Sequence, residues 1–214
     1  LVRFKSNETG EVKPFEFIPV LEHDFAFEEM GIWIMNRAMT DGRKLLDKNP
    51  DFVLGLNIAA SQLEDVFFVD TLKNISEITG FPLGNLSLEL SKDCRLMDWK
   101  LLNEKVRMLK DMGVRILLDD FGSGYASLET LKNIPVDIIK FDMQFVREMK
   151  DNDIAVEDMK RLAELAAIHN VSTCVKGIET EEVLNVIKGF SVRSGQGFLF
   201  EKPADIEYIM KKYM

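Results

Sequence analysis

Short apolar segments typical of strands alternate with amphipathic helical segments along most of this chain of 214 residues. The predicted strands are Val53–Ile58, Leu86–Leu90, Val114–Leu118, Ile138–Phe141, Ser172–Val175 and Gly197–Phe200. Apolar residues recur at helical spacing in Phe25–Leu46, Phe67–Thr79, Leu101–Met112 and Ile154–Ile168. Strands that alternate with helices predict an α/β fold with a parallel sheet, because a crossover helix usually joins two parallel strands. The sheet is either open and doubly wound or closed into a barrel.

Polar residues within or beside these strands favour the barrel. They are Asn57, Glu89, Asp119, Asp120, Lys140, Glu179 and Gln196, the last placed immediately before the sixth predicted strand. A barrel brings the carboxyl ends of all its strands to one face, where active sites are built, whereas an open sheet would spread these residues along a line. Each residue alone is more often a structural cap or a surface group. Their predicted convergence on one face indicates a functional site.

The most informative of these positions is the pair Asp119–Asp120, which ends the apolar segment Ile116–Leu118 and precedes a glycine-rich turn. Two adjacent carboxylates repel each other unless a cation or a hydrogen-bond donor lies between them. Oxygen ligands without histidine or thiolate suit Mg²⁺ or Mn²⁺ rather than Zn²⁺. Asp119, between Glu89 and Asp120, could bridge two ions about 4 Å apart, and a nearby lysine could steady the attacking water. The residues therefore predict a metal-dependent phosphoester site.

The composition narrows the classes of partner and the setting. The chain has 27 basic and 36 acidic residues, a balance that argues against binding a nucleic-acid polymer. It contains no apolar run near the ~18 residues of a membrane span, so no membrane contact is expected. Cys94 and Cys174 form no close motif, which favours a reducing cytoplasm. Because the sequence opens directly on the strand-like segment Leu1–Phe4, we expect it to be a fragment of a longer protein.

Several short motifs together resemble one known family. They are Leu1-Val2-Arg3-Phe4, Pro14–Pro19, Leu56-Asn57-Ile58-Ala59 with Gln62, Leu88-Glu89-Leu90-Ser91, Asp119–Tyr125, Ile139-Lys140-Phe141-Asp142, Gly177-Ile178-Glu179-Thr180 and Gln196–Phe200. In this order and spacing they resemble the EAL-domain family, bacterial phosphodiesterases that linearise cyclic di-GMP. The resemblance implies a modified TIM (β/α)8-type barrel whose first strand is antiparallel. It also implies a single domain over residues 1–214, with the glutamate of the first motif upstream of Leu1.

The resemblance also implies a role for individual residues. Asn57, Glu89 and Asp119 would ligate a first Mg²⁺ or Mn²⁺, Asp119 and Asp120 a second, and Lys140 would contact the nucleophilic water. The residues expected near the nucleotide are Arg3, Gln62, Asp142, Glu179 and Gln196. The loop Asp120–Gly124 would couple dimer contacts to the metal site. The implied partners are cyclic di-GMP, a second copy of the chain, and a fused sensor or diguanylate cyclase module.

Two lysines depart from the family pattern. The pattern Glu-Gly-Val-Glu reads Lys176-Gly177-Ile178-Glu179 here, so an ammonium replaces a carboxylate expected at or near the second metal. The pattern Glu-Leu-Thr-Glu reads Glu89-Leu90-Ser91-Lys92, so Lys92 replaces a glutamate that braces the loop after the paired aspartates. Both changes indicate weak or absent phosphodiesterase activity, although the family is one of hydrolases.

Lys176 decides between several hypotheses. At about 4 Å and an effective dielectric constant of about 20, like charges repel by about 4 kcal/mol, or roughly three orders of magnitude in metal affinity. The ammonium could instead pair with Asp120 and take the place of the missing ion. Alternatively, Lys176 points to solvent and the second metal ion still binds through other ligands. We therefore predict a degenerate EAL domain that acts as a cyclic di-GMP sensor or interaction module. The alternatives are an active Mg²⁺- or Mn²⁺-dependent phosphodiesterase that yields linear pGpG, and a scaffold that binds no nucleotide.

Overall fold

The computed structural model describes residues 2–8, 10–22, 24–122, 128–149 and 152–213, except for the side chains of residues 15, 92, 95 and 128–130. The chain divides into two compact units. The first unit comprises residues 1–54, 70–82 and 203–214, and the second comprises residues 55–69 and 83–202. The second unit contains the parallel sheet with almost all of the predicted site residues.

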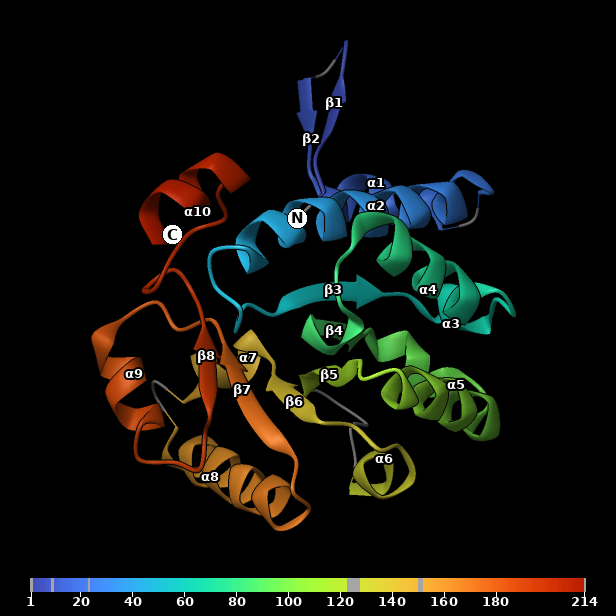
Figure 1. The fold of residues 1–214 in the computed structure, drawn as a ribbon. Helices are drawn as coiled ribbons and strands as arrows, with labels where there is room; N and C mark the ends of the chain where they lie inside the picture. Colours follow the sequence, from blue (N-terminus) through green and yellow to red (C-terminus); the bar gives the residue numbers. More distant parts are fainter. Residues whose placement is uncertain (1, 9, 23, 123–127, 150–151, 214) are drawn as a thin grey trace. The chain divides into compact units, whose positions relative to one another are not determined.

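The first unit contains a small hairpin and several helices (Figure 1). Its elements are β1 (Phe4–Ser6), β2 (Gly10–Val12), α1 (Pro14–Leu21), α2 (Ala26–Leu46), most of α4 (Phe68–Thr79) and α10 (Ile206–Tyr213). β1 pairs with β2 in antiparallel register, Phe4 opposite Val12. Helix α2 buries one stripe of its surface, including Met35 and Met39, as the spacing of its apolar residues predicts. The predicted segment Phe25–Leu46 is thus a helix.

The second unit is built on a curled sheet of six strands, which lie side by side in Figure 1. In spatial order they are β3 (Leu54–Ile58), β4 (Leu86–Leu90), β5 (Arg115–Phe121), β6 (Ile138–Phe141), β7 (Ser172–Lys176) and β8 (Ser194–Gln196). The pairings of β4 through β8 are parallel, with Leu88 opposite Ile116 and Val175 opposite Gly195. The parallel sheet and α/β class are those that the sequence predicts, and the antiparallel pairing lies in the β1–β2 hairpin.

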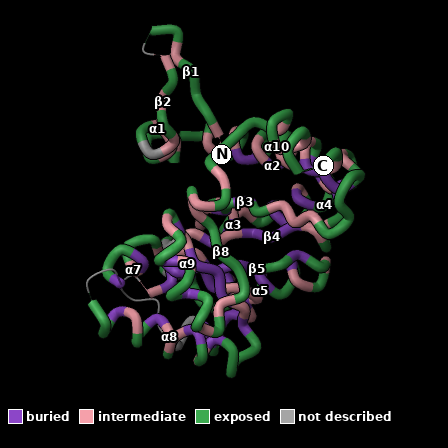
Figure 2. Tube along the Cα trace, turned by 90° about the vertical axis from the view of Figure 1, so that its left-hand side faces the viewer, coloured by how far each residue is buried: buried purple, intermediate pink, exposed green. Residues whose placement is uncertain are grey.

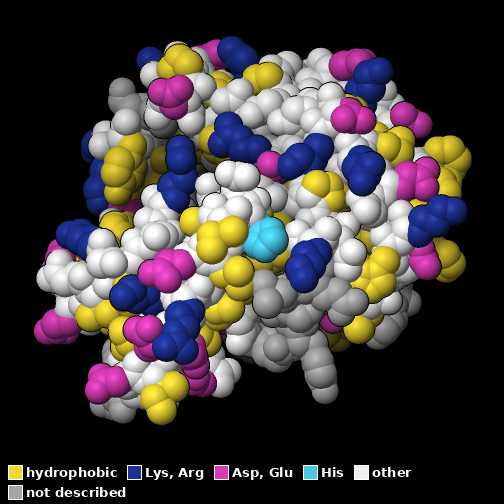
Figure 3. Space-filling view, turned by 90° about the horizontal axis from the view of Figure 1, so that it is seen from below, with side chains coloured by type: hydrophobic (Ala, Val, Ile, Leu, Met, Phe, Trp, Pro, Cys, Tyr) yellow, Lys and Arg dark blue, Asp and Glu magenta, His cyan; other side chains and the backbone are white. Residues whose placement is uncertain are grey.

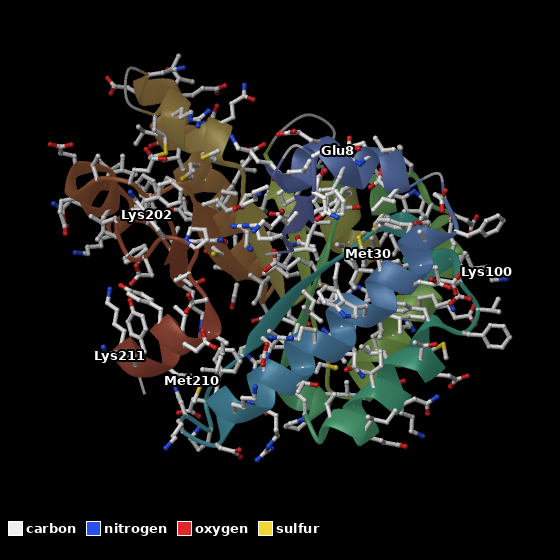
Figure 4. All side chains as sticks on the ribbon, turned by 90° about the horizontal axis from the view of Figure 1, so that it is seen from above. Glu8, Met30, Lys100, Lys202, Met210 and Lys211 are labelled. Carbon is white, nitrogen blue, oxygen red and sulfur yellow. The ribbon has the colours of Figure 1, made fainter. Side chains whose placement is uncertain are left out.

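Helices connect the strands of the second unit. They are α3 (Ala60–Glu64), α5 (Trp99–Asp111), α6 (Leu128–Asn133), α7 (Met143–Glu148), α8 (Asp153–Ile168) and α9 (Glu181–Ile187), with the short 3₁₀ helices η1 (Leu83–Asn85) and η2 (Lys92–Leu96). Helix α5 begins where the Asp98 carboxylate accepts hydrogen bonds from the backbone N–H groups of Lys100, labelled in Figure 4, and Leu101. Buried residues gather along the strands and on the helix faces that pack against them (Figure 2).

The predicted strand Gly197–Phe200 is wrong. The strand is Ser194–Gln196, and the four residues after it form a turn in which the Phe200 N–H donates to the carbonyl of Gly197 at 3.1 Å. Phe198 and Phe200 are 57% and 47% exposed, so their apolar character does not reflect burial. Lys202, labelled in Figure 4, places its Nζ 5.8 Å from the centre of the Phe198 ring. Gln196 is therefore the last residue of a strand instead of the residue before one.

One face of the molecule carries side chains of both charges. Basic and acidic side chains are interspersed on the face seen from below (Figure 3). Among the described residues, no helix is both long enough and apolar enough to span a membrane.

Candidate functional site

The paired aspartates lie inside β5 at an irregularity of the sheet. The register between β5 and β6 shifts between Leu118 and Phe121, and Asp120 has a backbone φ of +51°. Adjacent residues of a regular strand face opposite sides of a sheet, but a bulge redirects one of them. The irregularity therefore allows the carboxylates of Asp119 and Asp120 to reach the same partner.

That partner is the ammonium of Lys176, the last residue of β7. Its Nζ lies 2.8 Å from Oδ1 of Asp119 and donates a hydrogen bond to Oδ1 of Asp120. Because β6 lies between β5 and β7, the lysine side chain crosses one strand to reach both carboxylates. Its side chain is 21% exposed, so the structure rejects the alternative in which Lys176 points to solvent. The pairing with Asp120 that the sequence offered as one option is confirmed, and Asp119 shares it.

The surroundings favour the charged form of this lysine. Burial disfavours the ammonium, but the hydrogen bonds and the charges of Asp119 and Asp120 outweigh burial and raise the pKa of Lys176 above its usual value of 10.5. A raised folded-state pKa gives stability that is fully present below the pKa of the unfolded chain and is lost as pH rises through the folded value.

We therefore expect the pair to be insensitive to pH near neutrality. The difference in free energy of unfolding between the wild-type protein and Lys176→Met should stay constant from about pH 7 to about pH 9, since the unfolded lysine titrates near 10.4. It should begin to shrink once pH exceeds the pKa of the unfolded lysine and should be lost as pH rises through the raised folded value. Urea denaturation at a series of pH values measures this difference. A difference that already falls between pH 7 and 9 would contradict a charged Lys176.

A second ion pair lies on the same sheet. Lys140 on β6 donates from Nζ to Oε2 of Glu89 on β4 at 2.7 Å, and so spans β5. Lys140 is buried, with 5% of its surface exposed. Gly55 on β3 leaves room for the glutamate, because a Cβ at that position would lie 2.9 Å from Oε1 of Glu89. The sequence predicted Lys140 beside a nucleophilic water; its partner here is a predicted metal ligand.

The other predicted residues of the second unit lie on neighbouring elements. Asn57 is exposed on β3, on the face opposite buried Leu56 and Ile58. Oε1 of Gln62 accepts from the backbone N–H of Ala59 at 3.1 Å, at the start of α3. These contacts give Gln62 a local structural role, while Asn57 remains open to a ligand.

Three further predicted residues come from the β6–α7, β7–α9 and β8 segments. Asp142 begins α7 and accepts from the N–H of Gln144 at 2.9 Å. Glu179 is exposed and lines a small pocket with Arg147 and Thr180, among other residues. Gln196 pairs with Lys176 in the β7–β8 register, and its carbonyl accepts from the N–H of Ile178 at 3.1 Å. The sheet thus places Gln196 next to the Lys176 ion pair.

Some predictions fall elsewhere. Arg3 lies in the first unit, where its Nε is 3.3 Å from Oε1 of Glu11. Leu1, Ser123–Tyr125 and the side chain of Lys92 lie outside the described residues, so the proposed loop Asp120–Gly124 is described only as far as Gly122. The loss of the loop brace that Lys92 implies, by replacing a glutamate, therefore stays a prediction.

Sequence reasoning missed two residues of the site. Gly55 was not singled out, although it borders Glu89. Cys174 lies opposite Lys140 in the β6–β7 register, and burial raises the pKa of its thiol, with the charges of Glu89 and Asp119 adding to the rise. Neither residue belongs to a motif; the only available signal was strand position, since Gly55 precedes Asn57 by two residues and Cys174 precedes Lys176 by two.

The carboxylates do not fit the two-metal arrangement that the resemblance implies. Each of Glu89, Asp119 and Asp120 contacts a lysine ammonium. Within the described ranges, no group of three or more His, Cys, Asp or Glu side chains is placed to hold a metal ion. The chemistry of this edge, as it stands, is the partial charge compensation of three carboxylates by two lysines.

Comparisons with known proteins agree on the family. Residues 1–203 match the model of the EAL domain. The chain is 30% identical over 97% of its length to an uncharacterised signalling protein of Caulobacter vibrioides, and 29% identical over 95% to the cyclic di-GMP phosphodiesterase PdeR of Escherichia coli. It covers 25% and 31% of those two proteins.

A solved structure extends this likeness to the fold. The PaMucR phosphodiesterase in complex with cyclic di-GMP superimposes with a TM-score of 0.91 at 27% identity, over 98% of this chain and 85% of that one. The expected TIM-barrel-like fold is therefore confirmed. With a family model that matches nearly its whole length, the chain belongs to the EAL domain family of cyclic di-GMP phosphodiesterases.

Proposed function

We propose that this chain is a degenerate EAL domain that binds cyclic di-GMP but hydrolyses it weakly or not at all, and so serves as a nucleotide sensor or interaction module. The observation that carries the proposal is the ion pair of Lys176 with Asp119 and Asp120. Support for the ligand comes from the PaMucR phosphodiesterase, whose structure is a cyclic di-GMP complex. We further propose one domain over residues 1–214, within a longer cytoplasmic bacterial protein.

The ion pair argues against hydrolysis on chemical grounds. A divalent ion bound between two carboxylates lowers the pKa of a bound water and polarises the phosphate. An ammonium compensates one of the two carboxylate charges, yet it supplies neither a metal-bound hydroxide nor Lewis acidity. Lys140, the proposed contact of the nucleophilic water, is itself engaged by Glu89 at 2.7 Å. The aspartate pair and Lys140, both proposed parts of the catalytic machinery, are thus held in salt bridges.

Nucleotide binding, unlike hydrolysis, does not require a metal ion at this edge of the sheet. The proposed contacts are Arg3, Gln62, Asp142, Glu179 and Gln196. Four of them lie on segments of the second unit that follow or end its strands, and Glu179 and Gln196 are exposed. Such groups bind a ligand through hydrogen bonds that need no metal ion. Binding without turnover is therefore the combination that we expect.

The hydrolysis assay tests the proposal directly. Extended upstream of Leu1 to include the first-motif glutamate and incubated with cyclic di-GMP and either Mg²⁺ or Mn²⁺, the protein should give no more linear pGpG than a sample with EDTA, as measured by chromatography. Lys176→Glu should raise turnover by at least about tenfold, since it restores the charge that the family pattern has at this position. Lys188→Glu, which makes the same change at an exposed residue after α9, should change nothing. Clear wild-type turnover that Asp119→Ala abolishes would refute the degenerate reading.

One observation favours the active alternative. Glu89, Asp119, Asp120 and Lys140 all lie on adjacent strands of one sheet, as a phosphodiesterase would require. Wild-type turnover would support that alternative. Calorimetry in EDTA distinguishes the nucleotide sensor from the scaffold that binds no nucleotide. Heat of binding on addition of cyclic di-GMP supports the sensor. The absence of binding heat at ligand concentrations up to about 1 mM, near the weakest affinities usually measured, supports the scaffold.

A further inference from the structure

We propose that Lys176 is a tethered cation that takes the place of a divalent metal ion, so that the Asp119–Asp120 edge excludes metal in the wild-type protein and becomes a divalent-cation site once the ammonium is removed. This inference rests on the proposed function in one respect, because both assign Lys176 to the position of an expected metal ligand. It concerns metal binding and folding alone, however, and involves no nucleotide.

The first step is the charge balance of the site. Glu89 and Lys140 form a pair that is already neutral. Asp119 and Asp120 share the single ammonium of Lys176, so these three groups carry a net charge of about −1 when all are ionised. Without the ammonium the two carboxylates by themselves carry a charge of about −2. A divalent ion neutralises that charge fully.

The second step is enclosure. The exposed fractions of the side chains are 18% for Asp119, 34% for Asp120 and 21% for Lys176. Water therefore screens the carboxylates only partly, and their mutual repulsion is stronger than on an open surface. Loss of Lys176 should destabilise the fold, and a cation that binds between the carboxylates should restore the loss.

The third step is preorganisation. The register shift in β5 and the backbone of Asp120 bring both carboxylates to one ammonium. Strands β4 and β6 flank β5 on either side, so backbone pairing supports this geometry at both edges of β5. Carboxylate oxygens held in this way suit hard divalent ions, of which Mn²⁺ is a convenient probe.

Thermal unfolding without nucleotide provides the test. The melting temperature of the wild-type protein in EDTA and in excess Mn²⁺ should be the same. Lys176→Met should melt at a lower temperature in EDTA and gain roughly 5 °C or more when Mn²⁺ is at about 100 times its Kd. Lys176→Glu should gain more, because it adds a third carboxylate. Lys188→Met, the same substitution at an exposed lysine, should match the wild-type protein in both conditions.

Each departure from this pattern has a defined meaning. An equal Mn²⁺ gain in the wild-type protein and in Lys176→Met would overturn the proposal, since the lysine would then not exclude the ion. No gain in either Lys176 variant would overturn it as well. If Lys176→Met does not fold in EDTA, adding Asp120→Asn should relieve the repulsion, restore folding and abolish the Mn²⁺ response. A Mn²⁺ gain that persists in this double variant would place the ion elsewhere. None of these readings depends on hydrolysis or nucleotide binding.

Discussion

Replacing Gly197 with alanine should lower the free energy of unfolding by about 3 kcal/mol, at the upper end of the usual cost of overpacking. An added Cβ would lie 2.0 Å from the carbonyl oxygen of Ile178 and 2.4 Å from its nitrogen. These are backbone atoms held by hydrogen bonds, from the Ile178 N–H to Gln196 and from the Leu199 N–H to Ile178, both at 3.1 Å. No side-chain rotation relieves such a contact, so the chain after β8 must shift.

The shift of the urea denaturation midpoint measures this effect. Gly84→Ala is the matched control, because its added Cβ would have no neighbour within 4 Å. Alanine at such a position should be neutral or slightly stabilising, by less than about 1 kcal/mol. Equal midpoints for the two variants would show that the turn after β8 adapts without cost.

The substitution Lys140→Met should lower the free energy of unfolding by a similar amount, about 3 kcal/mol. It removes a buried ammonium, whose side chain is 7% exposed, from a carboxylate that is 17% exposed, and leaves Glu89 charged without this partner. Arg161→Met is the matched control, since Arg161 and Glu157 form an ion pair with exposed fractions of 69% and 49%. Loss of such an exposed pair typically costs under about 1 kcal/mol.

A double-mutant cycle separates the ion pair from the loss of packing. Lys140→Met combined with Glu89→Gln removes both charges, so the double variant should be more stable than Lys140→Met alone. Chemical denaturation of the four proteins gives the interaction energy between the two side chains. An interaction energy near zero would mean that Glu89 and Lys140 are independently solvated, against the 2.7 Å contact.

The fold was largely predictable because its strands are short and apolar and its helices are periodic. The segments Leu86–Leu90 and Ile138–Phe141 match β4 and β6 without error. The prediction failed at Gly197–Phe200, where two phenylalanines are exposed on a turn. Hydrophobicity cannot distinguish a strand from a turn when the deciding factor is a close backbone contact, here between Gly197 and Ile178.

The sequence identified the residues of the site better than it identified the contacts between them. Adjacent aspartates at a strand end pointed to a shared cation, and the sequence offered Lys176 as a partner of Asp120. It could not show that Asp119 joins this pair, because the outcome depends on a register shift and a positive φ. Nor could it show the Lys140–Glu89 bridge, since β4 and β6, which carry these residues, come within reach of each other across β5 only in the folded sheet.

The position of Lys176 at the end of β7 has a consequence for the history of such a domain. Lysine and glutamate codons differ only in their first base, so a single nucleotide change exchanges the cation for a carboxylate. The sheet around Asp119 and Asp120 keeps the backbone irregularity that gathers both acids. Under the proposed function, one base therefore separates a domain with a tethered cation at this edge from one with a third carboxylate there.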